Sequence, residues 1–552
     1  MVYITALGFK LISVGGKPVA KAKEQNYLHG AAILTAGVVI MKILGAIYKI
    51  PIGNLLGDDG YGLFISAYNV YSVFLMLATA GLPVALSRMI SEAHTQGRQM
   101  QARRTFSVAF WTFFALGAVS TAIMFLFPDW LAGILHNPDT SLSIRALAPA
   151  VLLVCLTSAF RGYAQGHENM IPTTVGQVLE VLVKVVVGLV LAWYFVSHGF
   201  EKTIASAGAI FGVTVGSLAV LLYMYVYKVR NYRIIPVAEP DVPDSRGEIF
   251  KNLVKIGIPI ALGSIVLSFI NLLDSGLCMA RLQGAAGFSY NQAKVLYGVY
   301  GKAQTLFNVP AAFITPLTIS VVPAIAAKIV LGNKKEAAKI SEDSLRISMA
   351  MCLPMGVGLA VLADPIMKII YPGAHESGTL LLCLLGIASI FVCFSLMTTA
   401  VLQASGREKL TAYSIIAGGL VKITVNWFLV GIPELNIYGA PIGTLCCYVT
   451  MCVLNLIFIA RSFDKSPSAV NVFLRPGIAC FIMGVAAYAV YYAGALVLNY
   501  DSKLYMAAAM CASIAIAVVV YAVAAIKMRA ITAEDMKLIP KGEKIAGLLH
   551  MR

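Results

Sequence analysis

Residues 28–52 read LHGAAILTAGVVIMKILGAIYKIPI, an apolar stretch that contains two charged residues, Lys42 and Lys49. About 20 mostly apolar residues suffice for a helix to span the hydrocarbon core of a bilayer. A helix is expected because backbone groups in lipid must pair within their own segment. A cation in hydrocarbon costs at least about 2.5 kcal/mol, so both lysines need a structural or functional compensation.

The rest of the chain repeats this pattern. Of its 552 residues, 59% are hydrophobic and 12% are charged, and the mean hydropathy is +0.82. These values predict an all-α, polytopic membrane protein. We expect about fourteen membrane-spanning helices, and Tyr290–Lys328 is long enough to require a kink or a tilt. The predicted spans begin near residues 28, 63, 106, 143, 174, 203, 253, 295, 345, 379, 411, 437, 470 and 504.

The net charge of +16 follows from topology. If the N-terminus is cytoplasmic, 31 of the 42 Lys and Arg residues fall on cytoplasmic segments and 5 fall on outer loops. The positive-inside rule explains this bias, so no nucleic-acid partner is expected and both termini are predicted to be cytoplasmic. Asp58 and Asp59 then fall on a predicted outer loop.

The chain contains an internal repeat. Gln165–Lys184 and Gln403–Lys422 have the same spacing, and Pro83 aligns with Pro323. Such repeats are typical of transporters built from two related bundles with a substrate site between them. We predict a cytoplasmic N-terminal segment (1–27), an N-lobe of six helices (28–227), a cytoplasmic linker (228–252), a C-lobe of six helices (253–460), two further helices (461–526) and a basic cytoplasmic tail (527–552).

Four stretches together resemble one known superfamily. They are NYLHGAAILTAG, KILGAIYKIPIGNLLGDDGYGLF, RGYAQGHENMIPT and LFNVPAAFITPLTISVVPAIA, and the similarity covers nearly the whole chain. The chain resembles the multidrug/oligosaccharidyl-lipid/polysaccharide exporters, and within them the stage V sporulation protein B and peptidoglycan lipid II flippase group.

This resemblance implies two lobes around a central cavity that opens alternately to either side, with two extra helices that form a hydrophobic groove. It also implies movement of undecaprenyl-pyrophosphate-linked sugars across the bacterial plasma membrane. Lys42 aligns with a basic, cavity-lining position of the family's first helix, and Tyr48, beside Lys49, aligns with the next one. Lys302 lies close to a basic position on the family's eighth helix.

Ionisable residues within the predicted spans are the candidate site residues. Lys42 and Lys49 are seven residues apart and so share a helix face. Lys49 could alternatively extend to the interface. Glu180 and Lys184 have the spacing of an intrahelical pair, which would neutralise both. Asp274 could pair with a first-helix lysine or bind a coupling cation, Na⁺ or H⁺. The full set of predicted cavity cations is Lys42, Lys49, Lys184, Lys302 and Lys422, with Asp274 and Glu180 as coupling or charge-pairing groups.

An excess of buried positive charge favours an anionic lipid-linked glycan precursor as the cargo. A cation-coupled multidrug exporter of the same superfamily and a non-transporting spore cell-wall assembly factor are the alternatives. No enzyme is predicted, and no catalytic residue, metal or cofactor is expected. The ten Cys and seven His residues form no metal motif, and the chain lacks a phosphate-binding Gly-rich loop. Membrane lipids are the other expected partner.

Overall fold

The computed structural model describes residues 11–14, 17–20, 27–232, 241–463, 467–497 and 502–530. Within these ranges, the backbone alone is described for residues 11–14, 17–20, 27–40, 42, 43, 46, 77, 232 and 497. Lys42 belongs to a helix, but its side chain lies outside the described residues.

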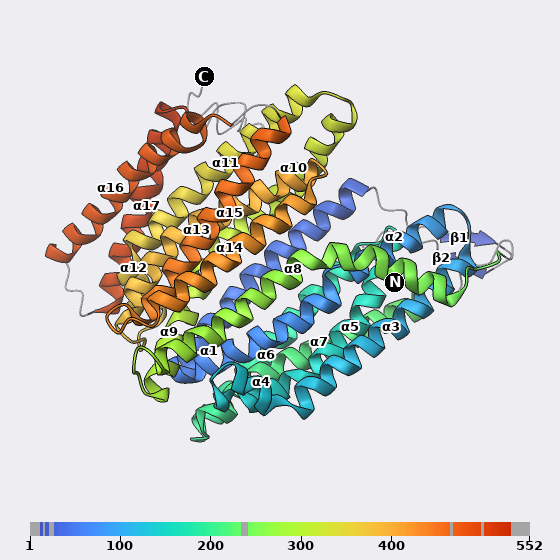
Figure 1. The fold of residues 1–552 in the computed structure, drawn as a ribbon, viewed down its shortest axis with the longest axis horizontal. Coiled ribbons are helices and arrows are strands. Elements are labelled where there is room, and N and C mark those ends of the chain that lie inside the picture. Colours follow the sequence, from blue (N-terminus) through green and yellow to red (C-terminus); the bar gives the residue numbers. More distant parts are fainter. Residues whose placement is uncertain are drawn as a thin grey trace.

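Helices make up nearly all of the described structure (Figure 1). The predicted all-α membrane fold is confirmed, with one local addition: two short antiparallel strands in the segment before the first span, which pair Leu11 with Ala20. The elements are β1 Leu11–Val14, β2 Lys17–Ala20, α1 Tyr27–Thr79, α2 Leu82–Thr95, α3 Gln99–Leu126, α4 Pro128–Ile134, η2 Pro138–Thr140, α5 Ser141–Gly166, α6 Ile171–Ser197, α7 Lys202–Tyr232, α8 Arg246–Gln283, α9 Tyr290–Phe307, α10 Val309–Val330, α11 Lys334–Val361, α12 Ala363–Ile370, α13 Ser377–Ala404, α14 Glu408–Leu429, η3 Asn436–Tyr438, α15 Gly439–Phe463, η4 Val470–Leu474, α16 Arg475–Val497 and α17 Lys503–Lys527.

The first two predicted spans both lie in α1, which is two helical arms joined at Gly57. Gly57 has φ 76° and ψ −173°, a conformation that is essentially restricted to glycine. The rings of Tyr48 and Phe64 are 6.1 Å apart, whereas sixteen residues of continuous helix would separate them by about 24 Å. The second arm therefore folds back along the first.

Twelve further segments between Gln99 and Lys527 are long and apolar enough to cross a membrane, and they correspond in order to the third through fourteenth predicted spans. The long segment that begins at Tyr290 is broken, because α9 and α10 meet at Asn308 and Pro310 cannot donate a helical hydrogen bond. The protein is thus a multi-pass membrane protein of the predicted class.

The helices form two bundles that repeat one packing pattern. In the first, α3 packs on α5, α5 on α7, and α7 on α6; in the second, α11 packs on α13, α13 on α15, and α15 on α14. Figure 1 shows the two bundles as separate groups, with α1 and α8 between them. We use N-lobe for α1–α7 and C-lobe for α8–α15. Helices α16 and α17 pack on each other and on the outer side of the C-lobe, against α11 and α12.

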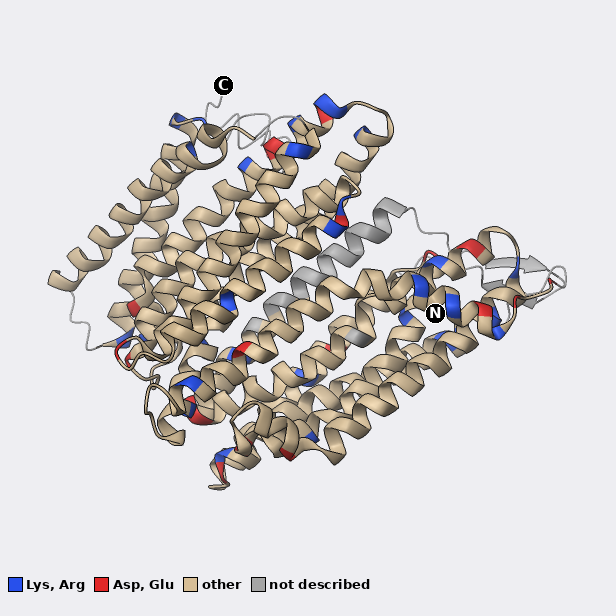
Figure 2. Cartoon of the chain, in the orientation of Figure 1, with Lys and Arg blue, Asp and Glu red and all other residues tan. Residues whose placement is uncertain are grey.

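The two lobes meet at the end of the bundle that contains Gly57, which we call the Gly57 end, and α8 also packs on α2 and α3 of the N-lobe. Direct contacts join the lobes at the Gly57 end: Asn54 Nδ2 donates to Ile370 O (2.8 Å), Tyr290 Oη donates to Asn137 Oδ1 (2.7 Å), Gln283 Nε2 donates to His136 O (2.9 Å), and Lys294 Nζ lies 2.9 Å from Asp139 Oδ2. Figure 2 shows that most charged residues gather at the two ends of the helices. The Gly57 end is thus closed by polar contacts between the lobes.

The opposite end contains residues 241–245 of the predicted linker, and we call it the linker end. Asp241 accepts hydrogen bonds from the backbone N–H groups of Met100 (2.8 Å) and Gln101 (2.9 Å). Helix α3 begins at Gln99 and receives no capping bond from the side chain of Arg98. Asp241 therefore supplies the missing N-cap from a distant part of the chain. Arg98 and Gln101 bind Asp244 as well, which fastens the linker to the N-lobe.

Candidate functional site: a cavity between the lobes

A cavity of about 570 Å³ lies between the lobes. Its N-lobe wall comes from α1, α6 and α7, and its C-lobe wall comes from α9 and α10. Most of the lining is apolar or aromatic, as is usual for small-molecule sites. The lining residues are Gly45, Ile47, Tyr48, Lys49, Ile50, Phe64, Tyr68, Lys184, Val213, Thr305, Asn308, Val309, Ala311, Ala312, Phe313 and Pro316.

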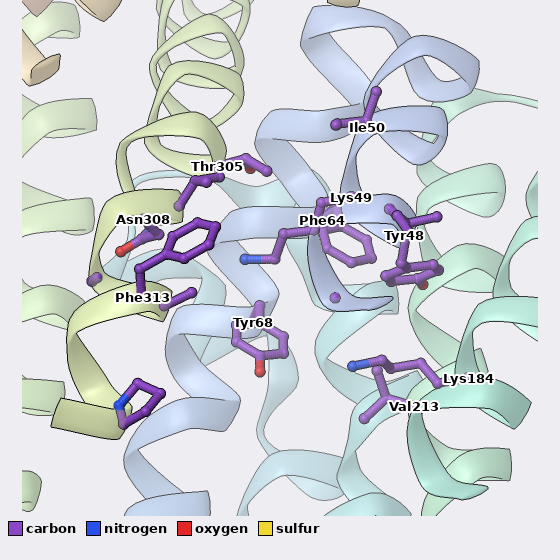
Figure 3. Close-up of a pocket in the computed structure, with 16 residues that line it drawn as sticks. Tyr48, Lys49, Ile50, Phe64, Tyr68, Lys184, Val213, Thr305, Asn308 and Phe313 are labelled. Atoms are coloured by element: carbon purple, nitrogen blue, oxygen red, sulfur yellow. The ribbon is translucent and has the colours of Figure 1, made fainter. Parts of the chain in front are cut away.

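Two predicted cations, Lys49 and Lys184, reach this cavity from different helices. Figure 3 shows Lys49 extending from α1 beside Phe64 and Lys184 extending from α6 near Val213, with Tyr68 below the ammonium group of Lys49 and to the left of that of Lys184. Lys49 Nζ is 5.5 Å from the centre of the Tyr68 ring, and Lys184 Nζ is 5.6 Å from that of Tyr48. Aromatic faces at these distances attract the ammonium groups weakly.

Tyr48, the position aligned with a basic residue of the resembling family, is buried and donates to Ala209 O at 2.8 Å. This bond ties the first arm of α1 to α7. It also fixes the aromatic ring beside Lys184.

Neither cavity lysine has a carboxylate partner among the described residues. The expected pair of Lys184 with Glu180 does not form, because Arg161 Nη2 binds Glu180 Oε2 at 2.7 Å. An arginine fork suits a carboxylate geometrically better than a lysine does. Arg161 is not among the predicted site residues, because it lies in the preceding span and faces α6 only after folding. The cavity therefore carries two lysine side chains that have no ion-pair partner among the described residues.

Lys302 does not line the cavity, contrary to the prediction. Its side chain is 2% exposed, and its Nζ lies 2.5 Å from Asp58 Oδ1. Asp58 was expected on an exposed outer loop. The turn at Gly57 instead directs this carboxylate toward α9, where it neutralises Lys302. The glycine just before Asp58 was the feature of the sequence that could have indicated a turn at this position.

Lys422 and Asp274 neutralise each other within the C-lobe, with 2.8 Å between Nζ and Oδ2. Asn426 also donates to Asp274. The predicted pairing of Asp274 with a first-helix lysine is therefore wrong, because α8 packs on α14 and brings Lys422 to it. Asp274 is therefore a charge-pairing group in this structure, which is one of the two roles expected for it. Among the described residues, no group of three or more His, Cys, Asp or Glu residues is arranged to hold a metal.

The chain matches a family described as "Polysaccharide biosynthesis protein" over residues 27–328. It is 26% identical to the stage V sporulation protein B of Bacillus subtilis (strain 168), over 79% of this chain and 84% of the relative. It is also 26% identical to the lipid II flippase MurJ of the same organism, over 79% of this chain and 83% of that protein.

Two solved structures share the fold. A lipid II flippase MurJ in an inward closed conformation superimposes with a TM-score of 0.66 at 14% identity, covering 90% of this chain and 99% of that one. An inward-facing multidrug resistance MATE family transporter of the MOP superfamily gives a TM-score of 0.65 at 15% identity, covering 79% of this chain and 98% of the other. Two of these proteins are named lipid II flippases and one is a multidrug resistance transporter of the MOP superfamily, which agrees with the predicted superfamily and with a non-enzymatic function.

Proposed function

Because the chain belongs to the polysaccharide biosynthesis protein family and has the fold of membrane flippases and exporters, we propose that it moves an undecaprenyl-pyrophosphate-linked glycan precursor across the bacterial plasma membrane. Lipid II, the peptidoglycan precursor, is the leading candidate, because a relative of similar length is named a lipid II flippase. The cargo would cross by alternating access between the lobes.

The observation that carries this proposal is the charge of the cavity. Lys49 and Lys184 line a mostly apolar space and lack a carboxylate partner within the described residues. A pyrophosphate would supply the missing negative charge, since charge-assisted hydrogen bonds to phosphate oxygens are the strong ones. A hydrophobic cationic drug would instead be repelled by these two ammonium groups.

The expected orientation places the linker end in the cytoplasm, because the segments there are rich in Lys and Arg. With the Gly57 end closed by contacts between the lobes, the cavity would accept cargo from the cytoplasmic side. Both termini would then be cytoplasmic. Transport would draw on the membrane potential or on an ion gradient, through Na⁺ or H⁺ coupling.

The test is transbilayer movement of fluorescently labelled lipid II in vesicles that contain the purified protein. Lys49→Gln and Lys184→Gln should each lower the initial rate about tenfold or more, since each removes a charge-assisted bond of about 1.5–3 kcal/mol. Lys335→Gln is the matched control, because Lys335 is exposed on α11 and far from the cavity. Its rate should equal that of the unmodified protein.

Native rates in both cavity variants would contradict the assignment of the site. Movement of a cationic drug, with no movement of lipid II or of an undecaprenyl-linked capsular oligosaccharide, would instead select the multidrug exporter. Absence of any transport in a protein that still supports spore cell-wall formation would select the assembly factor.

A further inference from the structure

A hydrogen bond between α1 and α9 lies at the cavity wall on its Gly57 side. Thr305 lines the cavity, and its Oγ1 lies 2.8 Å from the hydroxyl of Tyr61 in α1. Lys302 is three residues before Thr305 on α9, so it lies about one helical turn beyond this hydrogen bond. A buried cation therefore lies directly behind the cavity wall, toward the closed end.

Lys302 takes part in a buried bridge between the lobes. Asp58 uses both carboxylate oxygens: Oδ1 binds Lys302 Nζ at 2.5 Å and Oδ2 accepts from the backbone N–H of His375 at 2.9 Å. The ring of Tyr371 covers the ammonium group, with 5.4 Å between Nζ and the ring centre. Asp58 belongs to α1, whereas Lys302, Tyr371 and His375 belong to the C-lobe. We call this group the Asp58 latch.

The latch is more buried than the ion pair of Lys294 with Asp139, which also joins the lobes. The side chains of Lys302 and Asp58 are 2% and 10% exposed, whereas those of Lys294 and Asp139 are 11% and 38% exposed. Breaking a buried ion pair while one charge stays unpaired costs about 3–5 kcal/mol. The Gly57 end can thus open easily only if Lys302 finds another anion or if both charges reach water.

We propose that Lys302 is a phosphate-binding residue that the closed state masks, and that the phosphate of an arriving lipid-linked cargo takes Lys302 from Asp58 and so releases the lobes at the Gly57 end. This inference rests on the proposed function, because it assigns that function's cargo a second role. A ligand shifts a conformational equilibrium only through its different affinity for the two states, and the exchange of anions at Lys302 provides that difference.

The exchange also contributes to specificity. A neutral or cationic molecule in the cavity cannot replace a carboxylate at Lys302, so it leaves the latch closed. Only an anionic head group completes the step, and it then contacts Lys302 in addition to Lys49 and Lys184.

The test is a distance measurement between spin labels on the two lobes at the Gly57 end, in the full chain embedded in lipid nanodiscs. Asp129→Cys and Glu434→Cys place the labels at exposed positions, and Cys511→Ser removes the exposed native thiol. The probes are undecaprenyl pyrophosphate and the uncharged alcohol undecaprenol. In the otherwise native protein, the pyrophosphate should increase the open population and undecaprenol should not.

Asp58→Asn retains the shape of the side chain and can still accept from His375 N–H, but it no longer neutralises Lys302. We expect Asp58→Asn and Lys302→Gln to raise the ratio of open to closed molecules at least about tenfold without any probe. The charge exchange Asp58→Lys with Lys302→Asp should restore the closed distance. Lys368→Gln, which removes an exposed ion pair with Asp364 within the C-lobe, is the control and should shift the ratio by less than about twofold.

A closed Asp58→Asn protein, or equal opening by Lys368→Gln, would overturn the latch. Equal opening of the native protein by undecaprenol would overturn the exchange of anions. If the native protein binds no undecaprenyl pyrophosphate, the proposed cargo fails, but opening of the latch variants without a probe is measured independently of that result.

Discussion

At the scale of single residues, burial decides which charges are available to a cargo. The sequence shows which lysines lie among apolar residues, because that follows from the order of residues along the chain. It could not identify their partners, because Asp58, Arg161 and Asp274 reach Lys302, Glu180 and Lys422 only through contacts between helices that are distant in sequence. Lys49 and Lys184 stay without a carboxylate among the described residues.

The pair of Lys422 with Asp274 gives a prediction about stability. Lys422→Gln should destabilise the protein by about 3–5 kcal/mol, because it leaves a carboxylate buried without a cation. The double variant Asp274→Asn, Lys422→Gln should recover part of this loss, since both charges are then absent. Thermal unfolding in detergent measures both effects. The pairing would be contradicted if the double variant were less stable than Lys422→Gln by as much as Asp274→Asn alone destabilises the protein.

At the scale of elements, the turn at Gly57 controls the shape of α1. Apolar length indicated two spans here, but it did not indicate that both stretches belong to one element, α1, across one glycine. Gly57→Ala should cost about 1–3 kcal/mol, because φ 76° with ψ −173° strains any residue with a Cβ atom. In the control Gly133→Ala the new Cβ meets no atom within 4 Å, and α4 should become slightly more stable. Melting curves of the two variants compare these effects.

The capping of α3 by Asp241 gives a pH-dependent prediction. Partial burial raises the pKa of Asp241, but the hydrogen bonds from Gln101 and Met100 and the charge of Arg98 outweigh it and lower the pKa below its ordinary value of 3.8. A lowered pKa means that the carboxylate stabilises the fold above pH 3.8 and that this contribution disappears as the pH falls through the folded-state pKa.

Asp241→Asn should therefore lower the melting temperature at pH 7, by an amount that corresponds to about 0.5–2 kcal/mol. The difference from the unmodified protein should shrink as the pH falls below about 4. Glu201→Gln, at an exposed position before α7, serves as the control and should show neither effect. A difference between Asp241→Asn and the native protein that is independent of pH would argue against the carboxylate as the cap.

At the scale of the whole molecule, the internal repeat allowed the paired bundles to be anticipated from sequence, because repeated segments pack alike. A central cavity was expected from the resemblance, but its lining and the closed Gly57 end could not be anticipated, since they depend on how one bundle is rotated against the other. That rotation is set by contacts between the lobes, such as those of Asn54, Asn137 and Lys294, and no local pattern encodes them.

The closed Gly57 end predicts one-sided access to the cavity. Ile47 lines the cavity and is 52% exposed. In a Cys511→Ser background, Ile47→Cys should react with a membrane-impermeant thiol reagent in inverted vesicles at least about tenfold faster than in intact cells, because the linker end is expected to be cytoplasmic. Lys335→Cys should behave in the same way, whereas Glu376→Cys should show the opposite preference. Equal labelling of Ile47→Cys from both sides would contradict a closed Gly57 end.

The cap that Asp241 provides to α3 also has a consequence for biosynthesis. When the ribosome has inserted the first seven helices, the amide groups at the start of α3 still lack their acceptor, which is translated about 140 residues later. The first bundle is thus completed only when the residues just before α8, the first helix of the C-lobe, have been synthesised. A split gene intended to produce the halves separately should therefore be cut after residue 245 and not after residue 232.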